Sequence, residues 1–354
     1  MSPTKGAPAA WQVPPLRTTG AVAEWLGLTH GQLDWFADCQ EREARHPAGP
    51  LRHYSYVWLK GRGGKRRLLE APKRRLKEIQ RRLLHDILDL ITPHEAAHGF
   101  RSARSVATYA AAHVGKRIVL RFDLRSFFPS VRTSRVQAVF RTAGYPRDVA
   151  RVLAGLCTNR VPEDIWEGLS PDERRRCEVA TNRLLYRRAH LPQGAPTSPA
   201  LANLCAYRLD CRLDALARSL DATYTRYADD LTFSGGELLE RGARRFQVLV
   251  GSIALDEGFE LQMRKSRFMR QGVRQQLAGV VVNTRTNIRR EDYDRLKAIL
   301  TNCIRHGPAS QNRDGHSDFR GHLAGRIAYV AMLNPERGQR LRGLFDRIAW
   351  DGDG

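Results

Sequence analysis

Long apolar runs and an apolar leader are both missing from this 354-residue sequence. Its longest largely apolar stretch, residues 248–255, falls far short of the roughly 20 residues that a membrane-spanning helix requires. Residues 1–18 contain several prolines and alanines but no apolar signal core. We therefore expect no membrane partner and a cytoplasmic location.

Paired cysteines are absent as well. The six cysteines are scattered without a Cys-x-x-Cys motif, which argues against a disulfide scaffold of the kind found in small secreted proteins. Cys303, His306, His316 and His322 occur within a short segment, but their spacing fits no zinc pattern. We interpret that segment as a polar loop followed by a helix.

Acidic residues are scarce relative to basic ones. The sequence has 59 Lys and Arg against 37 Asp and Glu, which gives a formal net charge of +22 and a pI near 10.5. Such an excess indicates a polyanionic partner, because each phosphate contacted by Lys or Arg releases condensed counterions. Charge alone does not separate a nucleic acid from an anionic membrane surface.

Strand-like and helical patterns interleave irregularly along the chain, which predicts the α+β fold class. Alternation over 53–59, a glycine-rich turn and a return over 65–70 predict a β-hairpin with a basic tip. Apolar residues at helical spacing over 76–91 predict an amphipathic helix. Further strands are expected over 118–123, 223–234 (a strand–turn–strand) and 276–283, and further helices over 132–154, 203–220 and from 291 onward.

Three carboxylates stand out as candidates for chemistry. Asp229 and Asp230 lie between two segments rich in β-formers, which places them at the tip of a tight hairpin, and Asp123 ends a separate apolar strand. Adjacent carboxylates repel each other unless a cation lies between them. Three carboxylates from two adjacent strands could hold two Mg²⁺ ions about 3.5–4 Å apart for in-line phosphoryl transfer. For the Asp-Asp pair alone, a turn with solvated carboxylates is the common alternative.

Further motifs surround these carboxylates in a fixed order. They are HGFRS at 98–102, FDLRSFFPS at 122–130, LPQGAPTSP at 191–199, YADD at 227–230, GVVVN at 279–283, GRIA at 325–328 and NPERG at 334–338. Over about residues 20–350 this set resembles the retron-type (bacterial) reverse transcriptase family. The resemblance implies a right-hand polymerase fold with fingers, a palm made of an antiparallel sheet plus helices, and a helical thumb.

The resemblance also implies a division of the chain into four regions. Residues 1–50 would form a flexible lead and a helical region, and residues 51–117 the fingers. The palm with the catalytic carboxylates would span residues 118–275, with fingers elements interleaved. Residues 276–354 would form an RNA-binding thumb.

Site residues are implied in the same way. Asp123, Asp229 and Asp230 match the family's catalytic metal ligands, with two Mg²⁺ ions as the cofactor. Phe128 matches a steric gate against the ribonucleotide 2′-hydroxyl, although a core aromatic is the alternative. The remaining matches are Arg67, Gln193, Gly194 and Lys265 for nucleotide binding, and His113 and Arg326 for RNA binding, with a solvated lysine as the alternative for Lys265.

Two elements depart from the family pattern. Tyr109 takes the place of Asn in an Asn-Ala-x-x-His element that ends at His113, and residues 277–279 read Leu-Ala-Gly where Val-Thr-Gly is usual. Both elements are associated in the family with recognition of the cognate RNA. A non-retron bacterial defence reverse transcriptase therefore stays open as an alternative.

The favoured function is RNA-directed DNA polymerisation. The resemblance implies that the chain copies a structured non-coding RNA into single-stranded DNA from dNTPs, in antiphage defence, and a toxin or effector protein could be a further partner. A group II intron-type maturase fits less well, because the chain ends at Gly354, soon after the thumb. A catalytically silent RNA-binding protein of the same fold is the alternative from another functional class.

Overall fold

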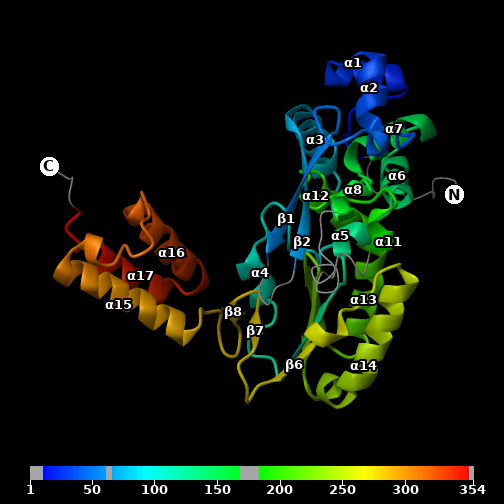
Figure 1. Ribbon diagram of the computed structural model, residues 1–354. Coiled ribbons are helices and arrows are strands. Elements are labelled where there is room, and N and C mark those ends of the chain that lie inside the picture. The colour runs from blue at the N-terminus through cyan, green and yellow to red at the C-terminus, as the bar shows by residue number, and fades with distance from the viewer. Residues whose placement is uncertain (1–10, 61–65, 168–182, 351–354) are drawn as a thin grey trace. The chain divides into compact units, whose positions relative to one another are not determined.

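The computed structural model describes residues 11–60, 66–167 and 183–350 (Figure 1). Contacts divide the chain into two compact units, each assembled from several stretches. Unit 1 comprises residues 1–100, 123–213 and 249–262, and unit 2 comprises residues 101–122, 214–248 and 263–354. No helix in the described ranges has the length and apolar character that crossing a membrane demands.

Unit 1 contains the predicted basic hairpin. β1 (Tyr54–Lys60) and β2 (Arg66–Pro72) pair antiparallel, with Tyr54 opposite Pro72 and Lys60 opposite Arg66. Alternate residues of β2 are buried, as expected of a strand with one covered face. The hairpin is therefore confirmed, and its tip over 61–65, including Lys65, lies outside the described residues.

Helices make up most of the remainder of unit 1. The helix predicted over 76–91 is confirmed as α3 (Arg74–Asp86), which buries Leu76, Ile79 and Leu83, and a 3₁₀ turn, η3 (Leu88–Leu90), replaces its last part. The other helices in order are α1 (Thr19–Leu26), α2 (His30–Ala37), α5 (Phe127–Ser130), α6 (Thr133–Thr142), α7 (Arg147–Cys157), α8 (Asp164–Glu167), α11 (Arg183–Tyr186) and α12 (Ser198–Cys205).

Two predicted helices are each broken into two. The prediction of a single helix over 132–154 is wrong, and α6 and α7 form instead. The helix ends because Gly144 adopts φ of 97° and Pro146 lacks the N–H that a continuing helix would need. The helix expected over 203–220 is likewise divided, at Ala206, into α12 and α13 (Tyr207–Arg218).

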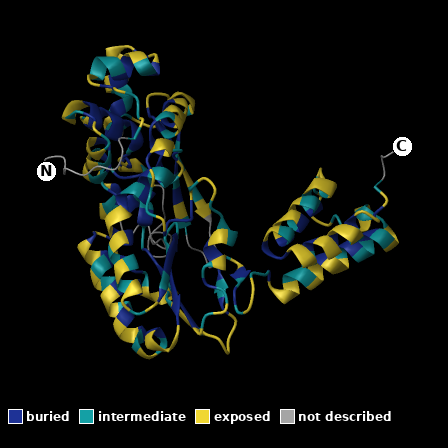
Figure 2. Ribbon diagram, turned by 180° about the vertical axis from the view of Figure 1, so that it is seen from behind, coloured by how far each residue is buried: buried dark blue, intermediate teal, exposed yellow. Residues whose placement is uncertain are grey.

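Unit 2 is built on a four-stranded sheet in the order β4-β5-β3-β6. Its strands are β3 (Ile118–Asp123), β4 (Thr223–Tyr227), β5 (Asp230–Gly235) and β6 (Arg267–Arg270). β4 pairs antiparallel with β5, and β3 with β6. The predicted strands over 118–123 and 223–234 are confirmed, and Figure 2 shows the central strands as buried.

Aromatic rings join the sheet to the long helix α14 (Glu237–Asp256). Phe233 on β5 packs against Phe122 on β3 and against Phe246 on α14, with ring centroids 5.9 and 4.9 Å apart. These rings form the core on one face of the sheet, so the strands that carry the candidate carboxylates rest on a packed layer.

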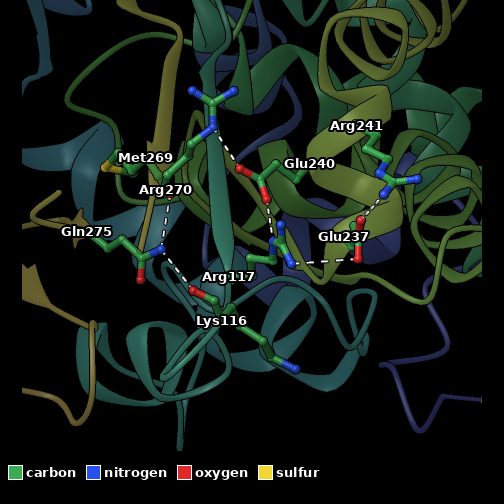
Figure 3. A network of polar contacts seen from close by, with 8 residues as sticks. All are labelled: Lys116, Arg117, Glu237, Glu240, Arg241, Met269, Arg270 and Gln275. Carbon is green, nitrogen blue, oxygen red and sulfur yellow. Dashed lines mark hydrogen bonds and ion pairs between the residues drawn. The ribbon is translucent and has the colours of Figure 1, made fainter. Parts of the chain in front are cut away.

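A polar network fastens the edge of the same sheet to α14 (Figure 3). Arg117, directly before β3, pairs with Glu237 and Glu240 of α14, and Arg270 of β6 donates to Glu240 at 2.7 Å. Hydrogen bonding by Arg117 lowers the pKa of Glu240, so this carboxylate stays ionised. The network orients the start of α14 against the strands.

Residues 276–283 do not form the single strand that the sequence predicts. That prediction is wrong, because two short strands, β7 (Gln276–Leu277) and β8 (Val280–Val281), pair antiparallel in its place. Between them Ala278 and Gly279 adopt φ of 45° and 92°, which reverses the chain. The short helix α4 (Val106–Ala111) contacts both β4 and β8.

The helical region predicted from residue 291 onward is confirmed. It consists of α15 (Arg290–His306), α16 (Phe319–Leu333) and α17 (Pro335–Phe345), and the polar loop expected after Cys303 leads into α16. Leu300, Leu323 and Leu341 lie in one buried cluster of these helices. α16 and α17 approach closely at Gly338, where an added Cβ would come within 2.4 Å of Ala331 Cα.

Candidate active site

The β4–β5 hairpin ends in a two-residue turn that carries the acidic pair. Its register places Tyr227 opposite Asp230, so Ala228 and Asp229 alone form the turn. Ala228 adopts φ of 57°, in the left-handed region that residues with a side chain seldom occupy. A conformation of that kind costs on the order of 1–3 kcal/mol and persists only where its surroundings enforce it. Contacts from outside the turn must therefore hold it.

The guanidinium of Arg226 supplies one such contact. Arg226 lies on β4 with its side chain fully buried, and its Nη1 donates to the carbonyl oxygen of Ala228 at 3.1 Å. A buried cation is costly unless it finds hydrogen-bond partners, so this position is strongly specified. Arg226 ties the strand to the strained turn that follows it.

Asp230 is held by a second arginine, from the neighbouring strand. Arg121 on β3 donates from Nε to Asp230 Oδ1 at 3.0 Å, and from Nη2 to Oδ1 and Oδ2 at 2.7 and 2.8 Å. The planar guanidinium suits a carboxylate with two acceptor oxygens, so Arg121 partly neutralises the acidic pair. No motif points to Arg121, but its place two residues before Asp123 could have indicated it, since such residues share a strand face.

Asp123 is the last residue of β3 and is only 6% exposed. Its carbonyl oxygen accepts a hydrogen bond from Gln262 N at 2.7 Å, and Arg125 N donates to Glu260 O at 2.7 Å. Backbone pairing on both sides of Asp123 therefore fixes the segment that carries its carboxylate.

The three candidate carboxylates are divided between the two units. Asp123 belongs to unit 1, and Asp229 and Asp230 belong to unit 2. β3, which ends at Asp123, is the sheet neighbour of β5, which begins at Asp230. Over residues 11–60, 66–167 and 183–350, no three His, Cys, Asp or Glu side chains form a group that could hold a metal ion. Joint metal binding by the three aspartates stays a prediction.

The loop at Gln193 and Gly194 is joined to the β1–β2 hairpin. Gln193 O accepts from Glu70 N of β2 at 2.8 Å, and Gly194 adopts φ of 130°. A Cβ at Gly194 would lie 2.9 Å from Glu70 O, so the close approach of β2 requires glycine here. Glu70 is itself buried and bonded to His190 Nε2 at 3.0 Å and to Asn159 Nδ2 at 2.7 Å.

The two adjacent phenylalanines after Asp123 differ in burial. Phe127 is buried and packs on Phe259 with centroids 5.6 Å apart, so it is a core aromatic. Phe128 is half-buried, with its ring 6.1 Å from Phe100 and 5.7 Å from Phe127. Phe128 is therefore supported from the side by other rings while part of its surface faces outward.

Three of the predicted basic contacts lie on accessible surfaces. Arg67 is exposed on β2, opposite Leu59, and Lys265 is exposed in the 3₁₀ turn η4 (Met263–Lys265). Arg326 is half-buried on α16. Arg67 and Lys265 are thus exposed to solvent, and Arg326 is partly exposed.

Comparison with known proteins identifies the family. A sequence profile of the family described as reverse transcriptase (RNA-dependent DNA polymerase) matches residues 59–289. The retron Mx65 reverse transcriptase of Myxococcus xanthus is 41% identical over 340 residues, which cover 94% of this chain and 72% of that protein. The chain belongs to the retron-type reverse transcriptases.

Two further relatives carry the same designation. The retron Mx162 reverse transcriptase of Myxococcus xanthus is 34% identical over 338 residues, covering 92% of this chain but only 65% of that protein. The retron Ec86 reverse transcriptase of Escherichia coli is 28% identical over 293 residues, covering 82% of this chain and 79% of that protein. This reverse transcriptase is accordingly an RNA-directed DNA polymerase, and its family implies a dependence on divalent metal ions in general.

The position of His113 in this reverse transcriptase contradicts a direct contact with RNA. His113 is fully buried, and both ring nitrogens lie within hydrogen-bond distance of hydroxyl groups on β4 and β5. A side chain enclosed in this way cannot reach a nucleic acid without leaving its network. The expectation that His113 binds RNA is therefore corrected.

Proposed function

We propose that this reverse transcriptase copies a structured non-coding RNA into single-stranded DNA, with Asp123, Asp229 and Asp230 as ligands of two Mg²⁺ ions. The observation that carries this proposal is the hairpin turn, where adjacent carboxylates are held in a strained backbone beside a guanidinium. Hard divalent cations prefer carboxylate oxygens, and the three aspartates supply only such donors.

The chemistry needs no nucleophile from the protein. Bound Mg²⁺ would activate the primer 3′-hydroxyl and stabilise the leaving pyrophosphate. The protein itself contributes by fixing the carboxylates in place, through Arg226 at the turn and through backbone pairing at Asp123. Rigid placement of this kind is what phosphoryl transfer requires, because the reaction depends on positioning and charge neutralisation.

The nucleotide would contact the further residues that the family resemblance assigns to nucleotide binding. Arg67 would grip the triphosphate and Lys265 the pyrophosphate, and both are exposed cations. The Gln193–Gly194 loop would lie against the base pair. Phe128 would exclude a ribonucleotide, since Phe100 and Phe127 limit the movement of its ring.

The RNA and its DNA copy would lie against the basic surface that a net charge of +22 implies. Within that surface we assign fingers to residues 51–117, palm to 118–275 and an RNA-binding thumb, which includes Arg326, to 276–354. A role in antiphage defence, a toxin or effector partner and a cytoplasmic location, where RNA and dNTPs occur together, belong to the same proposal.

The test is template-dependent synthesis by the purified chain. With Mg²⁺, an RNA template, a primer and dNTPs, the wild type should incorporate label, and Asp229→Asn should abolish incorporation. Asp346→Asn removes an exposed carboxylate after α17 and should leave synthesis unchanged. Robust synthesis by Asp229→Asn would refute the metal role, and no synthesis by the wild type would favour an RNA-binding protein without catalysis.

A further inference from the structure

Two polar side chains, one from α4 and one from the turn that follows it, reach the β4–β5 hairpin. Tyr109 lies in α4, and His113 lies two residues after the helix ends. Both are 0% exposed, and their rings meet edge to face with centroids 6.0 Å apart. They belong to the element that departs from the family pattern at Tyr109, so the departure lies inside the protein rather than on its surface.

Three short hydrogen bonds join these side chains to the strands beside Asp229 and Asp230. Tyr109 Oη lies 2.5 Å from Thr232 Oγ1 on β5. His113 Nε2 lies 2.7 Å from Thr225 Oγ1 on β4, and Nδ1 lies 2.6 Å from Ser234 Oγ on β5. The imidazole therefore bridges both strands of the hairpin.

The register of the hairpin makes this arrangement specific. Thr225 and Thr232 are cross-strand partners, and Thr232 is two residues from Asp230. Tyr109 also packs against Tyr227, with ring centroids 5.4 Å apart, and Tyr227 is the residue opposite Asp230. The contacts of α4 thus extend along the hairpin to the pair that closes the turn.

Further contacts fix α4 and the turn that follows it. Tyr109 lies in a buried cluster with Val119, Leu277 and Val280, and Gly115 N donates to Val282 O at 3.0 Å. A buried polar network whose members are all bonded favours one geometry, since any displacement leaves a polar group unpaired. α4 can therefore serve as a fixed support.

We propose that Tyr109 and His113 are positioning residues, which hold the β4–β5 hairpin so that Asp229 and Asp230 are placed for DNA synthesis. This inference rests on the proposed catalytic role of the two aspartates. It assigns an internal function to a sequence element whose counterpart in the family is associated with RNA. Neither side chain touches substrate, so their effect is exerted through Thr225, Thr232 and Ser234.

Single hydroxyl deletions test this role with little change in shape. Tyr109→Phe and Thr232→Val each remove one of the two hydroxyl groups that form the same hydrogen bond, and Thr232→Ser keeps the hydroxyl group. Displacement of reacting groups by about 1 Å can cost up to about 100-fold in rate. We expect kcat for dNTP incorporation at saturating template to fall about 10-fold or more in both deletions, with KM little changed, and Thr232→Ser to retain the wild-type kcat.

The double variant and a matched tyrosine complete the design. Tyr109→Phe combined with Thr232→Val should be no slower than the slower single variant, because both remove the same bond. Tyr145→Phe deletes a buried hydroxyl of unit 1 that has no hydrogen-bond partner, and it should not alter kcat. Circular dichroism and the thermal midpoint show that each variant is folded at the assay temperature.

The outcomes separate this inference from the proposed function. Folded Tyr109→Phe and Thr232→Val with wild-type kcat would overturn the positioning role, as would weaker RNA binding with kcat unchanged at saturating template. If Tyr109→Phe does not fold, the comparison of Thr232→Val with Thr232→Ser gives the same decision. Full synthesis by Asp229→Asn would instead refute the proposed function.

Discussion

Replacing Arg121 with Gln should increase the affinity of the hairpin for divalent metal ions. In the structure the Arg121 guanidinium makes three hydrogen bonds to Asp230, at 2.7 to 3.0 Å. A metal ion that binds Asp230 has to share or displace this cation. Glutamine keeps much of the length of the side chain but removes its charge.

The expected size of the effect follows from the partial burial of the pair. Unit charges about 4 Å apart attract by about 4 kcal/mol at an effective dielectric constant near 20. The Arg121 and Asp230 side chains are 32% and 14% exposed, so solvent screening reduces this value. Taking about 1–2 kcal/mol for the charged hydrogen bonds gives a gain in metal affinity of about 5- to 30-fold.

Metal binding can be measured without nucleic acid. Mn²⁺ titration followed by electron paramagnetic resonance should give tighter binding to Arg121→Gln than to the wild type. Arg117→Gln is the matched control, because Arg117 directly precedes the same strand but pairs with Glu237 and Glu240. Unchanged or weaker Mn²⁺ binding by a folded Arg121→Gln variant would refute the competition between the guanidinium and the metal.

Three further predictions concern stability. Gly194→Ala should lower the free energy of unfolding by about 1–3 kcal/mol in urea titrations, because its Cβ would lie 2.9 Å from Glu70 O at φ of 130°. Gly338→Ala should overpack the contact between α16 and α17, lower the free energy of unfolding by about 1–3 kcal/mol and speed hydrogen exchange in these two helices. Burial lowers the pKa of His53 to about 4, so the unfolded chain binds the extra proton first as pH falls. Stability should therefore drop between about pH 6.5 and 4, and His53→Gln should flatten that drop.

The sequence predicted the elements whose signals are local. The strand ending at Asp123 and the hairpin around Asp229 could be located because β-formers and turn residues follow one another directly. The breaks at Gly144 and at the Ala278–Gly279 turn were missed, although Pro146, which lacks a backbone N–H, could have indicated the first of them. A glycine can equally lie inside a helix, so its φ is decided by the packing around it.

Residues that act through distant contacts could not be assigned correctly. His113 bonds Thr225 and Ser234, more than 100 positions away, and nothing in the local sequence shows that its ring is enclosed. Gly194 adopts φ of 130° against the backbone of Glu70, a neighbour that its own motif does not show. Such roles depend on which segments the fold brings together.

The nucleic acid that co-purifies with the protein tests the central claim most directly. From cells that also contain its RNA, the wild-type chain should carry a DNA strand complementary to part of that RNA, and a covalent RNA–DNA junction would match the retron type. Asp229→Asn should carry the RNA alone. Equal amounts of the same DNA on both proteins would contradict catalysis by the hairpin carboxylates.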